Sequence, residues 1–373
     1  MKPFLKWPGG KTDELKIILE NIPKRINNYY EPFVGGGAVY FGIEQCNQFY
    51  INDKSEELMN LYVSVKERNK DFFYAIKEID NCWKLLENIT EKYIYELTFL
   101  YNKYKTDDIT DKELLKYVAN FILTKSEEFN GILNEQFIVD GKRILKELNK
   151  SVSRKLKRMK VIEAKSGTLP IEDVKENIET AFKGGLYTYF RFIYNNSEKL
   201  KVDKNFKNAI FYFIREYCYS SMFRYNKNGE FNVPYGGISY NRKYLERKIE
   251  YMKGCEIVNR LGATQIFSLD FEEFFSINPV KKDDFVFFDP PYDTIFSTYA
   301  NNAFGNDDHI RLAAFCKNIK SNFMLIIKNT DFIYNIYKDF YVKSFDKKYI
   351  VSFQNRNIKE AEHLLITNYT LKD

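Results

Sequence analysis

The stretch FVFFDPPY, residues 285–292, ends an apolar run on a carboxylate and two prolines. Residues 285–288 are all apolar, which is typical of a strand buried on both faces of a parallel sheet. Open α/β sheets bind ligands outside the carboxyl ends of their strands, so an acid directly after such a strand lies where a ligand would bind. The prolines fix the backbone and remove two N–H donors. The stretch predicts an α/β fold with a rigid cluster of acceptors, Asp289 and the Pro290 carbonyl, beside the ring of Tyr292.

This acceptor cluster suits a planar group that carries an exocyclic amine. The ring would stack on Tyr292 while Asp289 and the Pro290 carbonyl accept the two N–H bonds. Because the lone pair of an aromatic amine is delocalised into its ring, such an amine is a poor nucleophile. Acceptors that hold both hydrogens out of the ring plane favour a pyramidal nitrogen, and the preference grows as positive charge develops. We expect these three residues to be catalytic, with no metal and no covalent enzyme intermediate.

A second motif, FVGGGA at residues 33–38, follows another short apolar run. Glycines let the backbone approach a ligand closely and adopt positive φ without steric cost. Asp53 comes after the next expected strand, 18 residues beyond Gly35, near the spacing at which an acid binds ribose hydroxyls. Together they predict a site for an adenosine-containing cofactor formed by Gly35, Gly37 and Asp53. A plain glycine-rich turn and a helix-capping aspartate are the alternative interpretation.

The segment WPGGKT, residues 7–12, looks like the tail of a phosphate-binding loop. That motif requires a glycine five residues before the glycine of GKT, and this position is Leu5. A nucleoside triphosphatase is therefore excluded. The segment instead offers an aromatic face at Trp7 and a cation at Lys11, separated by a tight turn, with an ordinary loop as the alternative.

The α/β pattern occupies both ends of the chain. It opens with a strand, turn, helix, strand and acid, which is typical of nucleotide-binding α/β folds. It resumes near residue 256 with EIVN and closes with an expected hairpin of residues 349–353 and 363–369. Residues between them are rich in Lys, Glu, Tyr and Phe at helical spacing. We expect a catalytic domain formed by residues 1–70 and 251–373, interrupted by a mostly helical insertion at 71–250.

Composition narrows the functional classes. The 57 Lys and Arg and 51 Asp and Glu residues leave a net charge of +6, which is compatible with a polyanionic partner without demanding one. A basic run at residues 151–160 could follow a phosphate backbone or form a solvated helix face. Five scattered cysteines without a CxxC pair indicate neither a zinc site nor a disulfide framework. With no charge-free window of membrane-spanning length, we expect a cytoplasmic protein outside the membrane.

Taken in chain order, WPGGK, FVGGGA, IND and DPPY resemble the Dam-like (D12 class, α-group) DNA adenine-N6 methyltransferases, and so do QIFSLDF and YSSMFRYNKNGEFNVPYG. The resemblance covers about residues 1–65 and 209–300. It implies a Rossmann-like S-adenosylmethionine-dependent methyltransferase fold with an inserted, mostly helical DNA-recognition domain. It also implies methyl transfer from S-adenosylmethionine to adenine N6 at a specific duplex DNA site after base flipping.

The resemblance assigns roles to matching residues. It implies that S-adenosylmethionine is bound by Trp7, Lys11, Gly35, Gly37, Asp53, Asp270 and Asp289. It implies that the target adenine is bound by Asp289, Pro290 and Tyr292. It places a wedging aromatic at Tyr219 and a base-reading arginine at Arg224, in a DNA-binding loop that also holds Ser220, Asn226 and Pro234. Ser220 stands where GATC-specific members carry asparagine, so a GATC target is not implied.

The expected partners are double-stranded DNA and a companion restriction endonuclease, with the chain acting as a monomer. Two alternatives stay open. The acceptor cluster suits any conjugated amine, so an N4-cytosine or RNA adenine methyltransferase is one of them. The other is a non-catalytic DNA-recognition subunit. The intact DPPY motif argues against this second alternative.

Overall fold

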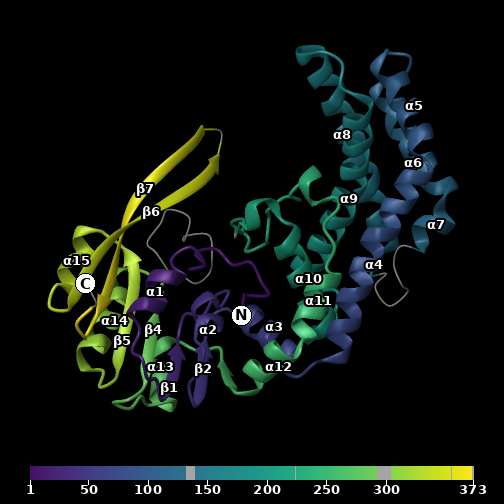
Figure 1. Cartoon of the computed structure of the whole chain (residues 1–373). Helices are drawn as coiled ribbons and strands as arrows, with labels where there is room; N and C mark the ends of the chain where they lie inside the picture. The colour runs from purple at the N-terminus through teal and green to yellow at the C-terminus, as the bar shows by residue number, and fades with distance from the viewer. Residues whose placement is uncertain (132–138, 223, 292–303, 354, 372–373) are drawn as a thin grey trace. The chain divides into compact units, whose positions relative to one another are not determined.

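The computed structural model describes residues 1–131, 139–222, 224–291, 304–353 and 355–371. The chain divides into two compact units, drawn together in Figure 1. The first unit consists of Met1–Glu67, Arg224–Gly229 and Lys253–Asp373, and the second of Arg68–Phe223 and Glu230–Met252. This division differs from the expected one because residues 224–229, inside the expected insertion, group with the first unit.

The first unit is built on a seven-stranded sheet in the order β3-β2-β1-β4-β5-β7-β6. The strands are β1 (Asn28–Glu31), β2 (Gln48–Asn52), β3 (Thr264–Phe267), β4 (Phe285–Phe288), β5 (Asn322–Lys328), β6 (Tyr341–Phe353) and β7 (Asn355–Thr367). Strands β1 to β5 pair in parallel, and β7 and β6 add an antiparallel hairpin. Because β1 lies between β2 and β4, the order reverses there, and the switch point lies at the carboxyl ends of β1 and β4.

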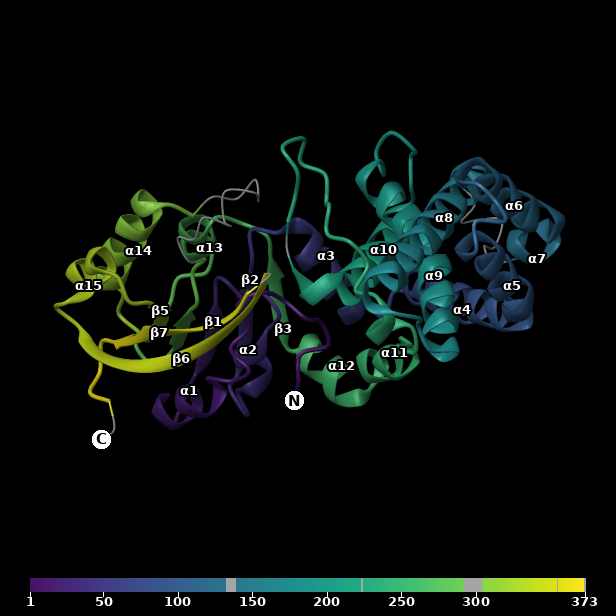
Figure 2. The same ribbon diagram turned by 90° about the horizontal axis from the view of Figure 1, so that it is seen from above.

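Helices cover both faces of this sheet, which explains why all four residues of β4 are buried. In Figure 2, α13 (Phe271–Ile277), α14 (Asn306–Asn318) and α15 (Asp331–Tyr337) lie on one side of the sheet, and α1 (Leu15–Asn21) and α2 (Ala38–Gly42) on the other. Aromatic rings join the layers: Tyr30 of β1 stacks on Tyr50 of β2 at 4.5 Å and also contacts Phe274 of α13. The expected α/β class is confirmed.

Two helices cover the β3 edge, α3 (Glu56–Lys66) and α12 (Cys255–Gly262). The EIVN segment, with which the α/β pattern was expected to resume, lies in α12. Ile257 within it and Leu261 just after it are both buried, four residues apart, as expected for one face of a helix. The first strand after the insertion is therefore β3.

The second unit is helical within the described residues. Its helices are α4 (Lys70–Lys92), α5 (Ile94–Lys105), α6 (Asp111–Thr124), α7 (Ser126–Asn130), α8 (Gly141–Ser166), α9 (Ile171–Asn195), α10 (Lys204–Tyr217) and α11 (Glu246–Lys253), with short 3-10 turns η2 (Tyr219–Ser221) and η3 (Ile238–Tyr240). Polar caps fix several starts: Asn69, Thr110 and Asp203 each accept a hydrogen bond from a backbone N–H of the first turn. No helix in the described part of the chain is long and apolar enough to cross a membrane.

A buried ion cluster joins α4 and α9 in the second unit. The ammonium of Lys183, with an exposed fraction of 0%, donates to Glu87 at 2.7 Å and to the Asn241 carbonyl at 2.5 Å. It also pairs with Glu179 at 2.7 Å and lies 5.1 Å from the centre of the Trp83 ring. Because the buried carboxylates need this cation, the cluster fixes how the two helices pack.

Lys183→Met is expected to lower the free energy of unfolding by up to about 3–5 kcal/mol, because two buried carboxylates lose their buried cation and keep only the more exposed Arg242 as a cationic partner. Urea unfolding measures the change. Lys175→Met on the same helix is the matched control, since its partner Glu172 is largely exposed and such pairs contribute about 0–1 kcal/mol. Equal losses in the two variants would contradict the assignment.

Candidate active site

A cavity of about 370 Å³ opens at the switch point of the sheet. The residues that directly follow β1, β2 and β4 line it, and so do Leu269 and Asp270 in the loop after β3, so the cavity lies at the edge where parallel strands present their carboxyl ends. Its volume lies in the range of small-molecule sites. The structure brings together in this cavity eight of the residues singled out in the sequence: Trp7, Lys11, Gly35, Gly37, Asp53, Asp270, Asp289 and Pro290.

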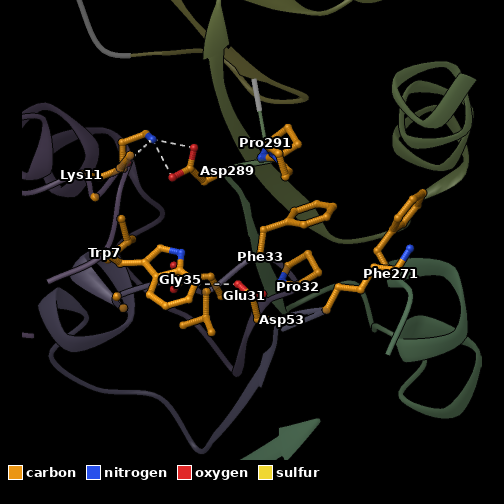
Figure 3. A pocket seen from close by; sticks show the side chains of 18 of the residues that line it. Trp7, Lys11, Glu31, Pro32, Phe33, Gly35, Asp53, Phe271, Asp289 and Pro291 are labelled. Carbon is orange, nitrogen blue, oxygen red and sulfur yellow. Dashed lines mark hydrogen bonds and ion pairs between the residues drawn. The ribbon is translucent and has the colours of Figure 1, made fainter. Parts of the chain in front are cut away.

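The glycine turn after β1 requires glycine at two positions. Gly35 and Gly37 have φ of +50° and +75°, in the left-handed region that L-residues avoid. A Cβ on Gly35 would lie 2.8 Å from Cδ1 of Trp7, and one on Gly37 would lie 2.6 Å from the hydroxyl oxygen of Tyr62. The turn is therefore packed tightly against Trp7 and Tyr62, and it lines the cavity. Figure 3 shows Trp7 beside Gly35.

Asp53 follows β2 and holds the glycine turn from the side. Its carboxylate accepts hydrogen bonds from the backbone N–H of Gly35 at 3.0 Å and of Ser55 at 2.9 Å. Burial raises the pKa of Asp53 to about 6, the nearby charge of Asp289 adds to the rise, and the two backbone hydrogen bonds oppose it. The glycine turn and Asp53, which the sequence predicts to form one site, are thus in direct contact, and Asp53 lines the cavity.

Asp289 lies directly after β4 and forms an ion pair with Lys11. The ammonium of Lys11 lies 2.5 Å from each carboxylate oxygen and also donates to the Gly9 carbonyl at 2.9 Å. Figure 3 shows the two side chains pointing toward one another at the cavity wall. Lys11 has an exposed fraction of 2% and Asp289 of 18%, so the cation is buried behind the carboxylate. The pair fixes the direction of the Asp289 carboxylate, and this contact between residues 278 positions apart was not predicted from the sequence.

Glu31 is a cavity residue that sequence reasoning missed. It is buried at the end of β1 and accepts a hydrogen bond of 2.6 Å from the hydroxyl of Tyr29. Burial raises its pKa well above the ordinary value, opposed by the Tyr29 hydrogen bond, while the charge of Asp289 adds to the rise. A signal was present, because Glu31 follows an apolar strand and precedes the glycine turn. The rule that identified Asp289 applies equally to it.

Asn52, the last residue of β2, was missed as well. Its buried amide nitrogen donates to the carbonyls of Pro32 and Leu269, each at 3.0 Å, and its oxygen accepts from the Leu269 N–H at 2.8 Å. The side chain thus joins the loops that follow β1 and β3. It positions both loops at the cavity without lining it.

Asp270 caps α13 by accepting from the N–H of Glu272 at 3.1 Å, and its carboxylate also pairs with Arg311 of α14 at 3.2 Å. Burial would raise the pKa of Asp270, but the hydrogen bonds and charge of Arg311 outweigh it and hold the pKa below the ordinary value. The Arg311 guanidinium also lies 4.9 Å from the centre of the Phe271 ring. Asp270 was predicted from the sequence, whereas no local signal identifies Arg311.

Three aromatic rings form one wall of the cavity. The ring centre of Phe33 lies 5.4 Å from that of Phe304, edge to face, and 5.9 Å from that of Phe271. An apolar wall in a cavity that also holds carboxylates suits a flat, partly apolar ligand. The aromatic wall was not predicted, since its rings come from three separate segments.

The remaining predicted residues lie elsewhere. Tyr292 is outside the described residues. Tyr219 is exposed by 37%, and its N–H donates to the Pro234 carbonyl at 2.8 Å, while Ser220 beside it has a φ of +52°. The structure thus places Tyr219 and Ser220 in the turn η2 of the second unit, with Pro234 hydrogen-bonded to it.

Arg224 and Asn226 group with the first unit. The side-chain oxygen of Asn226 accepts from the N–H of Asn228 at 2.9 Å, closing a short turn. The predicted DNA-binding residues are therefore divided between the two units.

Comparison with known proteins gives a consistent result. The family model of D12 class N6 adenine-specific DNA methyltransferases matches residues 7–162 and 159–351. Type II methyltransferase M.CviBI of Paramecium bursaria Chlorella virus NC1A is 26% identical over 374 residues, which cover 99% of this chain and 100% of that protein. Type II methyltransferase M.MjaIII of Methanocaldococcus jannaschii is 28% identical over 388 residues, 99% of each chain. A DNA adenine methylase of Haemophilus influenzae is 23% identical over 338 residues, 88% of this chain and 80% of that one.

Proposed function

The chain belongs to the D12 class N6 adenine-specific DNA methyltransferase family, and from this premise we propose that the cavity at the switch point is where it methylates adenine N6. The family confirms the expected activity, an adenine-specific DNA methyltransferase, and implies S-adenosylmethionine as methyl donor. The observation that carries the proposed site is that the loops after four parallel strands meet in one cavity holding both the glycine turn and Asp289. In this proposal the first unit is the Rossmann-like catalytic domain and the helical second unit is the DNA-recognition domain.

The residues of the cavity fit the donor. The glycine turn lines the cavity with its backbone, and Asp53 offers a carboxylate for ribose hydroxyls. Asp270 lies beside the aromatic wall, which suits an adenine ring. Trp7 and Lys11 line the opposite side. When bound, the donor supplies an electrophilic methyl group on a sulfonium, and the chemistry we derive needs no metal.

The acceptor role falls to Asp289 and the Pro290 carbonyl. A carboxylate has about four lone-pair sites, so Asp289 can keep its ion pair with Lys11 and still accept a hydrogen from the target amine. With Pro290 accepting the second hydrogen, the nitrogen is held pyramidal and its lone pair is available. Lys11 orients the carboxylate, and Tyr292 stays a prediction for stacking on the base.

The substrate in this proposal is double-stranded DNA, with the target adenine flipped out of the helix. Tyr219, exposed at its turn, would fill the gap, Arg224 would read a base, and Ser220, Asn226 and Pro234 would contact the DNA around them. Because similar proteins are type II methyltransferases, we extend the proposal to a companion restriction endonuclease, with this chain acting as a monomer.

Transfer of a labelled methyl group tests the proposed function. The purified chain is incubated with S-adenosylmethionine labelled in the methyl group and with duplex DNA or RNA, and the products are digested to nucleosides for mass spectrometry. We expect the label to appear in N6-methyl-2′-deoxyadenosine from the DNA duplex and not in any nucleoside from the RNA. Label in N4-methylcytosine or in RNA would replace the proposal with one of the alternatives, and no label from an intact chain would indicate a non-catalytic subunit.

The affinity for S-adenosylmethionine is expected to fall as the pH falls below about 6. The pKa of Asp53 is raised to about 6, so below that pH the group is protonated and accepts ribose hydroxyl hydrogen bonds poorly. For a single linked proton the loss approaches about tenfold per pH unit. Calorimetric titration of the donor without DNA, between pH 8 and pH 5, measures it.

Asp53→Asn is the control for this titration. It should bind the donor weakly at every pH and lose most of the pH dependence, because the titrating group is gone. A wild-type dissociation constant that stays level through pH 6 would contradict the proposed role of Asp53.

A further inference from the structure

Helix α8 carries ten Lys and Arg residues against two Glu residues. Both glutamates are buried and paired, Glu147 with Arg143 at 2.8 Å and Glu163 with Lys105 at 3.0 Å. Five of the cations stand at every fourth position and are all exposed; we call them the cationic row, and they are Lys142, Lys146, Lys150, Arg154 and Arg158.

The cationic row forms one ridge of the helix. Side chains four residues apart follow a line inclined by about 26° to the helix axis. At a rise of 1.5 Å per residue, the sixteen steps from Lys142 to Arg158 span about 24 Å. Helix α8 packs against α9 and α6, and Figure 1 shows it beside α9. Its side chains Leu148, Val152 and Leu156 are buried, whereas all five residues of the row are exposed to solvent.

Three of the other five cations of α8 form ion pairs with carboxylates, which is not seen for the cationic row among the described residues. Lys157 pairs with Asp111 at 2.6 Å, and Lys160 pairs with Asp107. In the part of the chain that the structure describes, no carboxylate forms an ion pair with any residue of the row. The row itself is therefore not part of the charge pairing that joins α8 to its neighbours.

Keeping these five charges in one line costs stability. Like charges four residues apart on a helix destabilise it by about 0.2–0.5 kcal/mol per pair, and the row contains four such pairs. The charges of the row also act on the neighbouring Lys155. Burial lowers the pKa of Lys155, and the positive charges of Arg158 and Arg154 lower it further. An anionic surface that binds the row would relieve this repulsion.

We propose that the cationic row of α8 binds the phosphate backbone of duplex DNA away from the bases that the enzyme reads. The proposal rests on the proposed function only in taking duplex DNA as the substrate. About 24 Å of duplex axis carries about 14 phosphate charges, so a row of this length meets more phosphates than it has cations. Phosphate contacts position a protein and carry no sequence information. The row would thus raise affinity for any duplex and make that affinity sensitive to salt.

Charge-neutralised variants of the full chain test the row. The row variant carries Lys142→Gln, Lys146→Gln, Lys150→Gln, Arg154→Gln and Arg158→Gln. The matched control carries glutamine at five exposed lysines outside α8, which are Lys16, Lys77, Lys282, Lys317 and Lys338. Each variant lowers the net charge by five, from +6 to +1, so only the position of the lost charges differs. Because the row variant loses repulsive pairs, it should melt no lower than the wild type.

Fluorescence anisotropy with a random-sequence DNA duplex, at salt concentrations from about 50 to about 200 mM, gives the slope of log affinity against log salt. Each lost phosphate contact should make this slope shallower by about 0.9, so three or more contacts change it by at least about 2.7. We expect this change in the row variant and not in the control, with affinity at the lowest salt reduced at least about tenfold. The affinity for S-adenosylmethionine should be unchanged.

Three outcomes would overturn the proposal. They are equal slopes in the row variant and the wild type, equal changes in the row variant and the control, and a change seen with an RNA duplex but not with DNA. The binding measurement needs no turnover. A wild-type chain that transferred no methyl group would therefore refute the proposed function without deciding the role of the row.

Discussion

Asp289→Asn is expected to reduce kcat for methyl transfer by at least about 100- to 1000-fold, the loss typical of removing one preorganised electrostatic group. The carboxylate at position 289 faces the cavity and is oriented by Lys11. An amide in its place has a single acceptor oxygen and brings two N–H donors, which oppose the N–H groups of the target amine. Single-turnover kinetics with saturating donor and DNA measures the chemical step directly.

The buried ion pair requires its own control, because Asp289→Asn leaves Lys11, exposed by 2%, without its anionic partner. Removing one partner of a buried pair is destabilising, whereas replacing both is often close to neutral. The double variant Lys11→Met with Asp289→Asn should therefore recover thermal stability but not kcat. If Asp289→Asn kept a kcat within tenfold of the wild type, the acceptor mechanism would be wrong.

Gly37→Ala is expected to abolish measurable donor binding and to lower the free energy of unfolding by about 2–5 kcal/mol. The residue has a φ of +75°, where an L-residue costs about 1–2 kcal/mol. Its Cβ would lie 2.6 Å from the hydroxyl oxygen of Tyr62 and 3.2 Å from the Phe41 ring, and such overpacking costs about 1–3 kcal/mol more. The turn must shift to relieve both, and it would shift toward the cavity. Calorimetric titration and urea unfolding measure the two effects.

Gly262→Ala at the end of α12 is the matched control, since no atom lies within 4 Å of its added Cβ. We expect its donor affinity and stability to equal those of the wild type. Similar results for Gly37→Ala and Gly262→Ala would mean that the glycine turn does not hold the donor.

The sequence predicts much of the cavity because one rule applies repeatedly. Acids and glycines that directly follow parallel strands must meet at the carboxyl edge of the sheet, and Gly35, Asp53 and Asp289 do so. The same rule applied fully would have added Glu31, which was passed over because the glycine turn dominates its segment. Asn52 was missed because its role is to join two loops, and a lone asparagine at a strand end does not reveal its partners.

Contacts between distant segments could not be read from local patterns. The Lys11–Asp289 pair and the Arg311–Asp270 pair depend on how helices and loops pack on the finished sheet. The spacing of apolar residues predicts the α/β class and the helical middle. The grouping of residues 224–229 with the first unit depends on tertiary contacts, which local sequence patterns do not reveal.

A crystal structure of the chain with S-adenosylhomocysteine, the product left by the donor, would locate the donor site. We expect the ligand to fill the cavity after β1 and β4, with its ribose hydroxyls bonded to Asp53 and its sulfur directed toward Asp289. Binding at another place, or a ligand whose sulfur points away from Asp289, would contradict the proposed site.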